Sequence, residues 1–233
     1  MIDRSLNYGR LEIASFLEKS APFDMVLDLG AGHGDDLEEA RRYSRNAKLH
    51  AVEGYEPYAR ELEARRVQVD RLNIERDRLP FANASVDLII ANQILEHTKE
   101  IFWILHEVSR VLKVGGHFIL GVPNLAALHN RFLLLMGRQP SPIKSNSAHV
   151  RGFTKNDILA FLESGFRGGY ALEQFKGSNF YPFPPLLARP LAKTFPSMAW
   201  GIFLLLRKTC EYEGGFLSYP INAQLETNFY LGE

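Results

Sequence analysis

The stretch 25-MVLDLGAGHG-34 joins a short apolar run to three closely spaced glycines, Gly30, Gly32 and Gly34. A short apolar run that glycine closes is typical of a strand buried inside a parallel sheet. The glycines let the backbone turn sharply and approach a ligand, because no Cβ stands in the way. The helix expected after them presents free N–H groups to a bound group. Several nucleotide-binding folds share such a loop, so other features must decide which ligand it takes.

Outward from this stretch, strand-like apolar runs alternate with apolar residues at helical spacing. This alternation predicts an α/β fold of the doubly wound, Rossmann-like type, with a mostly parallel seven-stranded sheet and helices on both faces. The expected elements are helices over 5–18, 35–44, 57–65 and 101–112, the last stopping at Gly115-Gly116, and strands over 25–29, 49–53, 67–72, 86–91 and 117–122.

The chain after residue 123 is less regular and contains several prolines between 182 and 196. We expect a helix over 125–136, a loop over 139–148 and a helix that begins after a capping signal at Thr154 and ends at Gly165. Two last strands are expected near 166–172 and 202–207. In the tail 211–233, the stretch from Leu225 to Tyr230 either adds a terminal strand or folds over the active site.

Composition narrows the classes of function. Lys plus Arg number 27, as do Asp plus Glu, so no net charge favours nucleic acid as a partner. Cys210 is the one cysteine, which favours a cytoplasmic, reducing compartment. Residues 1–20 lack the apolar core of a signal peptide. The apolar stretch 197–206 is shorter than the about 20 residues that span a bilayer, so we expect a buried strand and leave peripheral membrane contact open.

Three features favour a sulfonium ligand over NAD. The glycines follow the spacing G-x-G-x-G, not G-x-G-x-x-G, and only one such loop is evident. Asp35 and Asp36 open the next helix, where two carboxylates would repel a pyrophosphate but tolerate a net-cationic sulfonium. Third, the alternation of strands and helices continues through a fifth strand. Separately from these three features, Glu53 closes the second strand about 20 residues beyond the loop, where an acidic side chain can accept hydrogen bonds from both hydroxyls of a ribose.

At this point the sequence resembles a known family, the class I S-adenosylmethionine-dependent methyltransferases. The stretch 26-VLDLGAGHG-34 looks like their first motif, and Glu53 matches their ribose-binding acid. The segments 79–81 and 86–97 are similar to the surroundings of their fourth strand, and 110–116 resembles the turn before their fifth. The resemblance covers about residues 20–125 and says nothing about the methyl acceptor.

The resemblance implies a methyltransferase that uses S-adenosylmethionine and releases S-adenosylhomocysteine. It predicts a single domain over 1–233, with an N-terminal cap helix over 1–20, a cofactor-binding core over 20–125 and substrate or lid elements over 123–152 and 174–200. The cofactor-binding residues expected from it are Asp28, Gly30, Ala31, Gly32, Gly34, Glu53, Gly54, Asn73, Ile74, Asn92 and Gln93. Of these, Asn73 departs from the Asp that the family often has beside the adenine, although an amide oxygen can also accept the hydrogen bond.

Methyl transfer from a sulfonium needs a general base only where the acceptor must lose a proton. His97, after the fourth strand, is the first candidate, with packing or capping as the alternative, and His149 is the second. His129 is expected to be structural. Tyr8 and Arg10 belong to the segment that often covers the cofactor, and a solvated Arg10 is expected over one that pairs with the methionine carboxylate. No metal-ligand spacing is evident.

The acceptor is expected to be a small molecule, such as a sugar, a lipid-linked compound or an aromatic metabolite, methylated on O, N or C. Five aromatic residues are candidates to line its pocket, although core packing is the alternative for most: Phe175, Phe180, Tyr181, Phe183 and Trp200. Two other functions stay open, a non-catalytic cofactor-binding regulator and an NAD-dependent oxidoreductase. The sequence leaves the oligomeric state undetermined.

Overall fold

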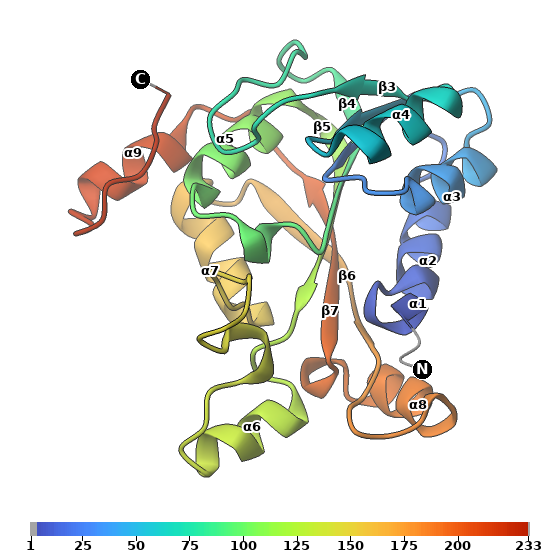
Figure 1. Cartoon of the computed structure of the whole chain (residues 1–233). Helices are drawn as coiled ribbons and strands as arrows, with labels where there is room; N and C mark the ends of the chain where they lie inside the picture. The colour runs from blue at the N-terminus through green and yellow to red at the C-terminus, as the bar shows by residue number, and fades with distance from the viewer. Residues whose placement is uncertain (1–3, 233) are drawn as a thin grey trace.

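The computed structural model describes residues 4–232, and these contain a seven-stranded sheet with helices on both faces (Figure 1). This confirms the expected α/β fold class. The strand order is β3-β2-β1-β4-β5-β7-β6. The strands are β1 (Met25–Leu29), β2 (Lys48–Val52), β3 (Gln68–Asp70), β4 (Val86–Asn92), β5 (Leu112–Pro123), β6 (Tyr170–Ser178) and β7 (Gly201–Lys208).

The strand order reverses at the centre of the sheet, between β1 and β4. From there β2 and β3 extend to one side, and β5, β7 and β6 extend to the other. The pairs from β3 to β5 are parallel, whereas β7 is antiparallel to both of its neighbours. Open α/β sheets bind ligands where the strand order reverses, at the carboxyl ends of the strands. In this chain that position lies just beyond Leu29 and Asn92.

The helices cover the sheet in two layers. Alternate side chains of each strand point to opposite faces, so Val26 and Leu27 belong to different cores. One core includes α2, α3 and α4, and the other includes α5, α7 and α9. The α-helices of the described residues are α1 (Arg4–Asn7), α2 (Arg10–Ser20), α3 (Asp35–Tyr43), α4 (Glu56–Ala64), α5 (Ile101–Val111), α6 (Leu128–Leu135), α7 (Lys155–Gly165), α8 (Pro185–Thr194) and α9 (Gly215–Asn222).

Short 3₁₀ turns link several of these elements: η1 (Leu95–His97), η2 (Ser141–Ile143) and η3 (Pro196–Met198). Figure 1 shows α6 and α8 at the end of the sheet from which β7 starts, which is also where β5 ends. Buried asparagine side chains join the segment after β5 to η3 and to α6 at this end of the sheet. Asn124 Nδ2 donates to the carbonyls of Ser197 and Ala199, and Asn130 Nδ2 donates to the carbonyl of Asn124.

The regular part of the chain follows the sequence expectations to within a few residues, with differences at α5 and at the N-terminal helix. The helix expected over 101–112 ends at Val111, and β5 begins at Leu112 rather than at His117, because Leu112 already pairs with Val86. The expected helix over 5–18 is divided by Gly9, whose φ of 59° is left-handed and where a Cβ would collide with Phe203.

Two expectations for the later chain are corrected, and one helix is found that was not expected. The strand expected near 166–172 lies at Tyr170–Ser178, since antiparallel pairing with β7 fixes its register. The proline-rich segment contains α8, which has Pro185 in its first turn, where proline is tolerated. The stretch from Leu225 to Tyr230 is not a strand. It lies along α5 instead, where Tyr230 N donates to Glu100 Oε2.

The apolar stretch 197–206 forms η3 and most of β7, whose residues from Gly201 to Leu206 are buried. This confirms the expected buried strand. Among residues 4–232, no helix has the length and apolar character needed to cross a membrane. The expected Thr154 cap is also present, because its side chain accepts from the backbone N–H of Asp157 and begins α7.

Candidate functional site

The glycine loop between β1 and α3 uses its glycines in two ways. Gly30, Gly32 and Gly34 all have left-handed φ angles, of 70°, 54° and 76°. A Cβ at Gly30 would lie 2.7 Å from Ile94, and one at Gly34 would lie 2.4 Å from Leu62, so these two positions need glycine for packing. A Cβ at Gly32 would meet nothing within 4 Å. Gly32 therefore faces open space.

A cavity of about 440 Å³ lies against this loop. Its size falls in the range of ligand pockets, roughly 300–1,000 Å³. The walls come from the end of β1, the loop, the starts of α3 and α4, the end of β4 and the segment before α2. The lining residues are Tyr8, Arg10, Asp28, Gly30, Ala31, Gly32, His33, Asp35, Asp36, Tyr58, Asn92 and Gln93.

Glu53 follows β2 and is fixed beside the loop. Its Oε2 accepts a hydrogen bond from Gly32 N at 2.8 Å, and its Oε1 accepts one from Tyr55 N at 2.7 Å. The side chain is buried, and a carboxylate oxygen can accept more than one hydrogen bond. Gly54, next in the chain, leaves space where a Cβ would stand. Glu53 can therefore bind a further donor without changing its orientation.

Asp28 is a buried carboxyl group at the end of β1 that lines the cavity. Burial raises its pKa well above the usual range, and the negative charges of Asp36 and Glu53 raise it further, while Arg10 opposes them. A cation placed in the cavity would favour the charged form of this carboxyl. The site is thus electrostatically suited to a positively charged ligand group.

A network of charged and amide side chains from the start of α2, the start of α3 and the end of β4 forms another wall of the cavity. Arg10 pairs with Asp36 and, at 2.6 Å, with Asp35. Asn92 Nδ2 donates to Asp36 Oδ2 at 2.8 Å and to the carbonyl of Tyr8 at 3.1 Å. The expectation of a solvated Arg10 is wrong, because the two aspartates hold it at the cavity.

Two polar atoms in this wall are buried without a hydrogen-bond partner, Asn92 Oδ1 and Gln93 Nε2. Unpaired buried polar atoms are costly, so they commonly mark a place where a ligand or water binds. Gln93 also has a left-handed φ of 58°, which is uncommon for a residue other than glycine. Backbone strain of this kind clusters at binding sites.

Asn73 and Ile74 do not line this cavity. Asn73 Oδ1 accepts from Glu75 N at 3.0 Å and closes a turn after β3, and Ile74 packs on the core beneath α5. Two lining residues were missed by the sequence reasoning, His33 and Tyr58, whose ring centroids lie 4.3 Å apart. Their positions in a loop and on a helix face carry no sequence signal of their own.

The histidine candidates lie together. The rings of His97 and His149 are T-shaped, with centroids 4.6 Å apart, and Glu96 is beside them. Burial raises the pKa of Glu96 to about 7, and burial together with His97 lowers that of His149. No metal-ligand spacing could be recognised in the sequence, because His149 meets Glu96 and His97 through a contact between distant segments.

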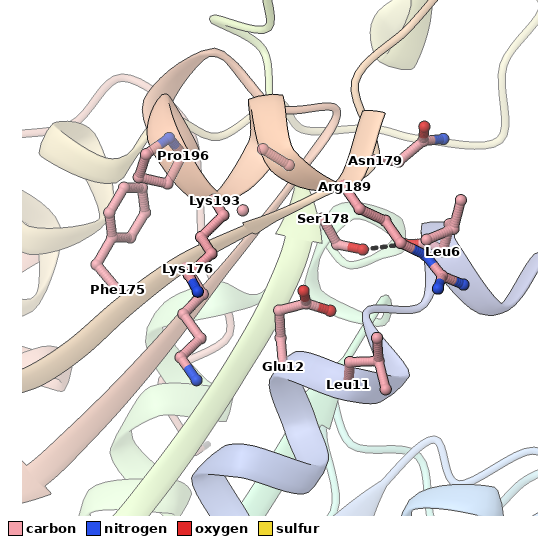
Figure 2. Close-up of a pocket in the computed structure, with 12 residues that line it drawn as sticks. Leu6, Leu11, Glu12, Phe175, Lys176, Ser178, Asn179, Arg189, Lys193 and Pro196 are labelled. Carbon is pink, nitrogen blue, oxygen red and sulfur yellow. Dashed lines mark hydrogen bonds between the residues drawn. The ribbon is translucent and has the colours of Figure 1, made fainter. Parts of the chain in front are cut away.

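Two further cavities flank the carboxyl edge of the sheet. One, of about 770 Å³, has mostly apolar walls that include Phe132, Phe183 and Trp200. His129 lines it and bonds Ser141 Oγ at 2.9 Å. The other, of about 300 Å³, lies between α2, β6 and α8. Figure 2 shows its walls, where cations from β6 and α8 surround Glu12.

Comparisons with known proteins agree with this geometry. The family model described as "Methyltransferase domain" matches residues 27–120. A probable S-adenosylmethionine-dependent methyltransferase of Mycolicibacterium smegmatis is 30% identical over 155 residues, which are 66% of this chain and 56% of that protein. The chain thus spans about half the length of the curated relatives it matches.

Solved structures show the same fold. One is the 1,6-didemethyltoxoflavin-N1-methyltransferase of Burkholderia thailandensis, with its substrate and S-adenosylhomocysteine bound; it has a TM-score of 0.60 at 19% identity over 88% of this chain and 80% of the other. Another is an S-adenosylmethionine-dependent methyltransferase from Mesorhizobium loti, with a TM-score of 0.55 at 18% identity over 82% and 95%.

Residues 27–120 of the chain are thus similar to the methyltransferase domain, and the sheet with its helices has the fold of S-adenosylmethionine-dependent methyltransferases of known structure. The curated relative from Mycolicibacterium smegmatis is named for the same cofactor.

Proposed function

We propose that this chain binds S-adenosylmethionine in the glycine-loop cavity and transfers its methyl group to an O, N or C atom of a small molecule. One observation carries the proposal. The cavity has open space at Gly32 and unpaired polar atoms on Asn92 and Gln93, and Glu53, which lies outside the cavity lining together with Gly34 and Gly54, is bonded to Gly32 at its edge. At Gly32 a ligand can approach the backbone closely. Glu53 offers hydrogen-bond acceptors for ribose hydroxyls, and the unpaired side-chain atoms can form hydrogen bonds with the amino-acid end of the cofactor.

Each polar group has a role in this proposal. Glu53 accepts from the ribose hydroxyls, while Asp28 faces the ammonium group and Asn92 holds Asp36 and the Tyr8 carbonyl in place. Gln93 Nε2 donates to the methionine carboxylate, and Ala31 and the three loop glycines lie along the methionine and sulfonium. Gly54, Asn73 and Ile74 stay predictions for the adenosine end. The bound cofactor supplies a methyl group on a cationic sulfur, which leaves as a neutral thioether.

The chain's contribution to such a reaction is mainly alignment, since the methyl carrier is already activated. The cavity walls on β1 and β4 are rigid strand ends, so they can hold the reacting atoms in line. Water exclusion would come from the segment Tyr8 to Arg10, which Asn92 and the two aspartates hold over the cleft. His97 and His149 remain candidates to accept a proton from an acceptor that must lose one.

The large apolar cavity supports a ring-containing or apolar acceptor. Asn7 lines that cavity, and Tyr8 lines the cofactor cavity, so one short segment separates the two. Tyr181, Phe183 and Trp200 supply flat apolar surface for a ring. The methyltransferase from Burkholderia thailandensis acts on a ring-containing small molecule, which fits this proposal. Phe175 lies in the cavity of Figure 2 instead.

We also propose that the end of the molecule that carries α6 and α8 makes peripheral contact with a lipid surface. Leu135 on α6 is 83% exposed and Leu186 on α8 is 85% exposed. Arg131 and Arg189 are exposed on the same helices and would favour anionic lipid. Contact of this kind suits a lipid-linked acceptor. The cytoplasmic location predicted from the single cysteine stays a prediction.

A pair of glycine substitutions tests cofactor binding. Gly32→Ala forces a Cβ into the open space of the cavity at a left-handed φ, and Gly115→Ala places the same strain (φ 84°) at an open turn inside β5. Both should lower stability by about 1–2 kcal/mol. Only Gly32→Ala should weaken stabilisation by S-adenosylhomocysteine in a thermal-shift assay. If S-adenosylhomocysteine stabilised Gly32→Ala and Gly115→Ala to the same reduced extent, the assignment of the cavity as the cofactor site would be overturned.

Catalysis needs its own measurement. The chain is incubated with methyl-labelled cofactor and cell extract, and the labelled product is identified. A labelled small molecule supports the proposed function, whereas cofactor binding without transfer to any component indicates the regulatory alternative. Tight NAD binding without stabilisation by S-adenosylhomocysteine would indicate the oxidoreductase alternative.

A further inference from the structure

A group of three metal-ligand side chains lies beside the cofactor cleft. Glu96 and His97 come from η1, and His149 comes from the segment between η2 and α7. One ligand atom from each lies within 4.8 Å of the other two. The proposed cofactor site uses none of the three, and metal binding is an alternative to the proton-acceptor role of His97 or His149, because a nitrogen bound to a metal cannot take up a proton.

The backbone holds the three side chains together. Val150 N and Arg151 N donate to the carbonyl of Glu96 at 2.9 and 3.3 Å, which fixes the segment of His149 against η1. His149 N donates to Ser147 Oγ at 3.1 Å. These contacts preorganise the group, because the backbone already holds the three side chains close together before a ligand binds.

The group has unused bonding capacity in its interior. Glu96 Oε2 and His149 Nδ1 are buried and lack a hydrogen-bond partner. Glu96 is 2% exposed, and among the side chains described, those of residues 6–232, no cation forms an ion pair with it. The guanidinium of nearby Arg151 donates instead to the carbonyl of Lys99 at 2.8 Å. Burying a carboxylate without a cation beside it costs free energy, so a cation bound at Glu96 would offset that cost.

We propose that Glu96, His97 and His149 together bind one divalent transition-metal ion. Two neutral imidazoles and one carboxylate form a donor set that suits zinc and its neighbours, rather than calcium or magnesium, which prefer oxygen ligands. Three protein ligands leave at least one coordination position for water or substrate. The exposed His97 places that position toward solvent.

A consequence of this site rests on the proposed function. Glu96 and His97 follow Asn92 and Gln93, which line the cofactor cavity, and Ile94 between them packs against Gly30 of the loop. None of the three side chains lines the cofactor cavity or the apolar cavity, so the consequence holds for an acceptor bound on the Ile94 side of the cleft. A divalent metal lowers the pKa of an oxygen that it binds, so an acceptor hydroxyl would lose its proton to water more readily. The site therefore favours an oxygen acceptor.

Metal binding is tested on the untagged full chain after treatment with a chelator. Zinc is titrated by calorimetry, and bound zinc is counted by mass spectrometry after dialysis. We expect one equivalent in the wild type and at least a tenfold weaker affinity in Glu96→Gln and His149→Ala. The matched control is His117→Ala, which removes an imidazole that lies 3.3 Å from Glu173 on the sheet. This variant should bind zinc as the wild type does.

The absence of stoichiometric zinc in the wild type would overturn the site, as would equal zinc affinity in the wild type and both cluster variants. Cobalt absorption of the wild type gives a second readout that does not depend on any variant folding: strong visible bands of a four-coordinate site support the site, and the spectrum of free aqueous cobalt contradicts it. Binding of S-adenosylhomocysteine is measured in chelator alongside. Cofactor binding without metal binding defeats only this inference, and metal binding without cofactor binding defeats only the proposed function.

Discussion

The cofactor cavity and the apolar cavity beside it are built by different kinds of contact. Around the cofactor cavity, backbone bonds between neighbouring strand ends hold the walls, such as Gly30 N to Val52 O and Gln93 N to Gly121 O, both 2.8 Å. Around the apolar cavity, distant segments meet through side-chain amides. Asn179 Nδ2 donates to Asn7 Oδ1 at 2.7 Å, and Asn124 bonds the turn before Trp200.

This difference teaches which parts of the molecule can vary without loss of the fold. Strand ends belong to the sheet, so a change at the cofactor cavity reaches the core directly. The apolar cavity is closed by α6 and by the turn after β6, where many apolar side chains are exposed. Its residues can change while the sheet persists, which suits a region that selects among acceptors.

The largest expected effect tests the frame of the sheet at the edge where β4 and β5 begin, opposite the cofactor cavity. Arg110 makes two bonds of 2.6 Å to the buried Glu107 and one of 2.7 Å to the carbonyl of Phe81. Arg110→Met leaves Glu107 as an uncompensated buried charge, so it should lower the free energy of unfolding by about 3–5 kcal/mol in urea denaturation. The control Arg60→Met breaks an exposed pair with Glu56 and should cost less than about 1 kcal/mol. Similar losses of unfolding free energy in Arg110→Met and Arg60→Met would contradict the role of Arg110 as the compensating charge of the buried Glu107.

The next effect concerns cofactor affinity. Glu53→Gln keeps the shape of the side chain but removes its charge and the acceptor capacity of one oxygen. Hydrogen bonds to charged groups contribute about 1.5–3 kcal/mol, so affinity for S-adenosylhomocysteine should fall roughly tenfold or more in calorimetry. Glu63→Gln, which changes an exposed carboxylate paired with Arg71, should leave the affinity unchanged. Unaltered affinity in Glu53→Gln would remove this residue from the site.

A smaller effect has a defined pH dependence. The pKa of Asp28 is raised in the folded chain by burial and by the charges of Asp36 and Glu53. Ionisation therefore costs stability in the folded state, a cost absent below the unfolded pKa of about 3.9 and complete above the folded pKa. Asp28→Asn removes the cost and should stabilise the ligand-free chain by about 1 kcal/mol or more at pH 8, with little change near pH 4.

Thermal unfolding at the two pH values measures the Asp28→Asn effect, and a shift of about 2–4 °C corresponds to each kcal/mol. The same variant should bind S-adenosylhomocysteine more weakly than the wild type. A gain in stability at low pH that vanishes at high pH would have the wrong sign and would contradict the assignment.

The smallest effect on stability is expected at the acceptor end. Leu135→Ser changes an exposed side chain and should alter the free energy of unfolding by no more than about 0.5 kcal/mol. Together with Leu186→Ser it should lower the fraction of the chain that sediments with anionic vesicles. Val114→Ser, at an exposed position of β5, is the control. Vesicle binding that is equal in all these variants would exclude lipid contact through α6 and α8.

The regular part of the fold was predictable because its signals are local. The apolar run of β1, the glycines after it and Glu53 at the end of β2 can each be recognised within a few residues. The predictable site residues lie on strand ends, where the register of parallel strands brings them to one edge. The register of β6 and the helix α8 were not predictable, because pairing with β7 and packing between distant segments determine them.

By itself, the sequence determined the strand–loop–helix unit around Gly30 to Gly34, because glycine alone tolerates those left-handed angles beside Ile94 and Leu62. It also determined Asp28 and Glu53 as acidic residues at strand ends. Only the tertiary structure decided that Arg10 pairs with the two aspartates and that His149 meets Glu96. Both contacts join segments far apart in the chain, and no local pattern encodes a contact whose geometry depends on packing of the whole sheet.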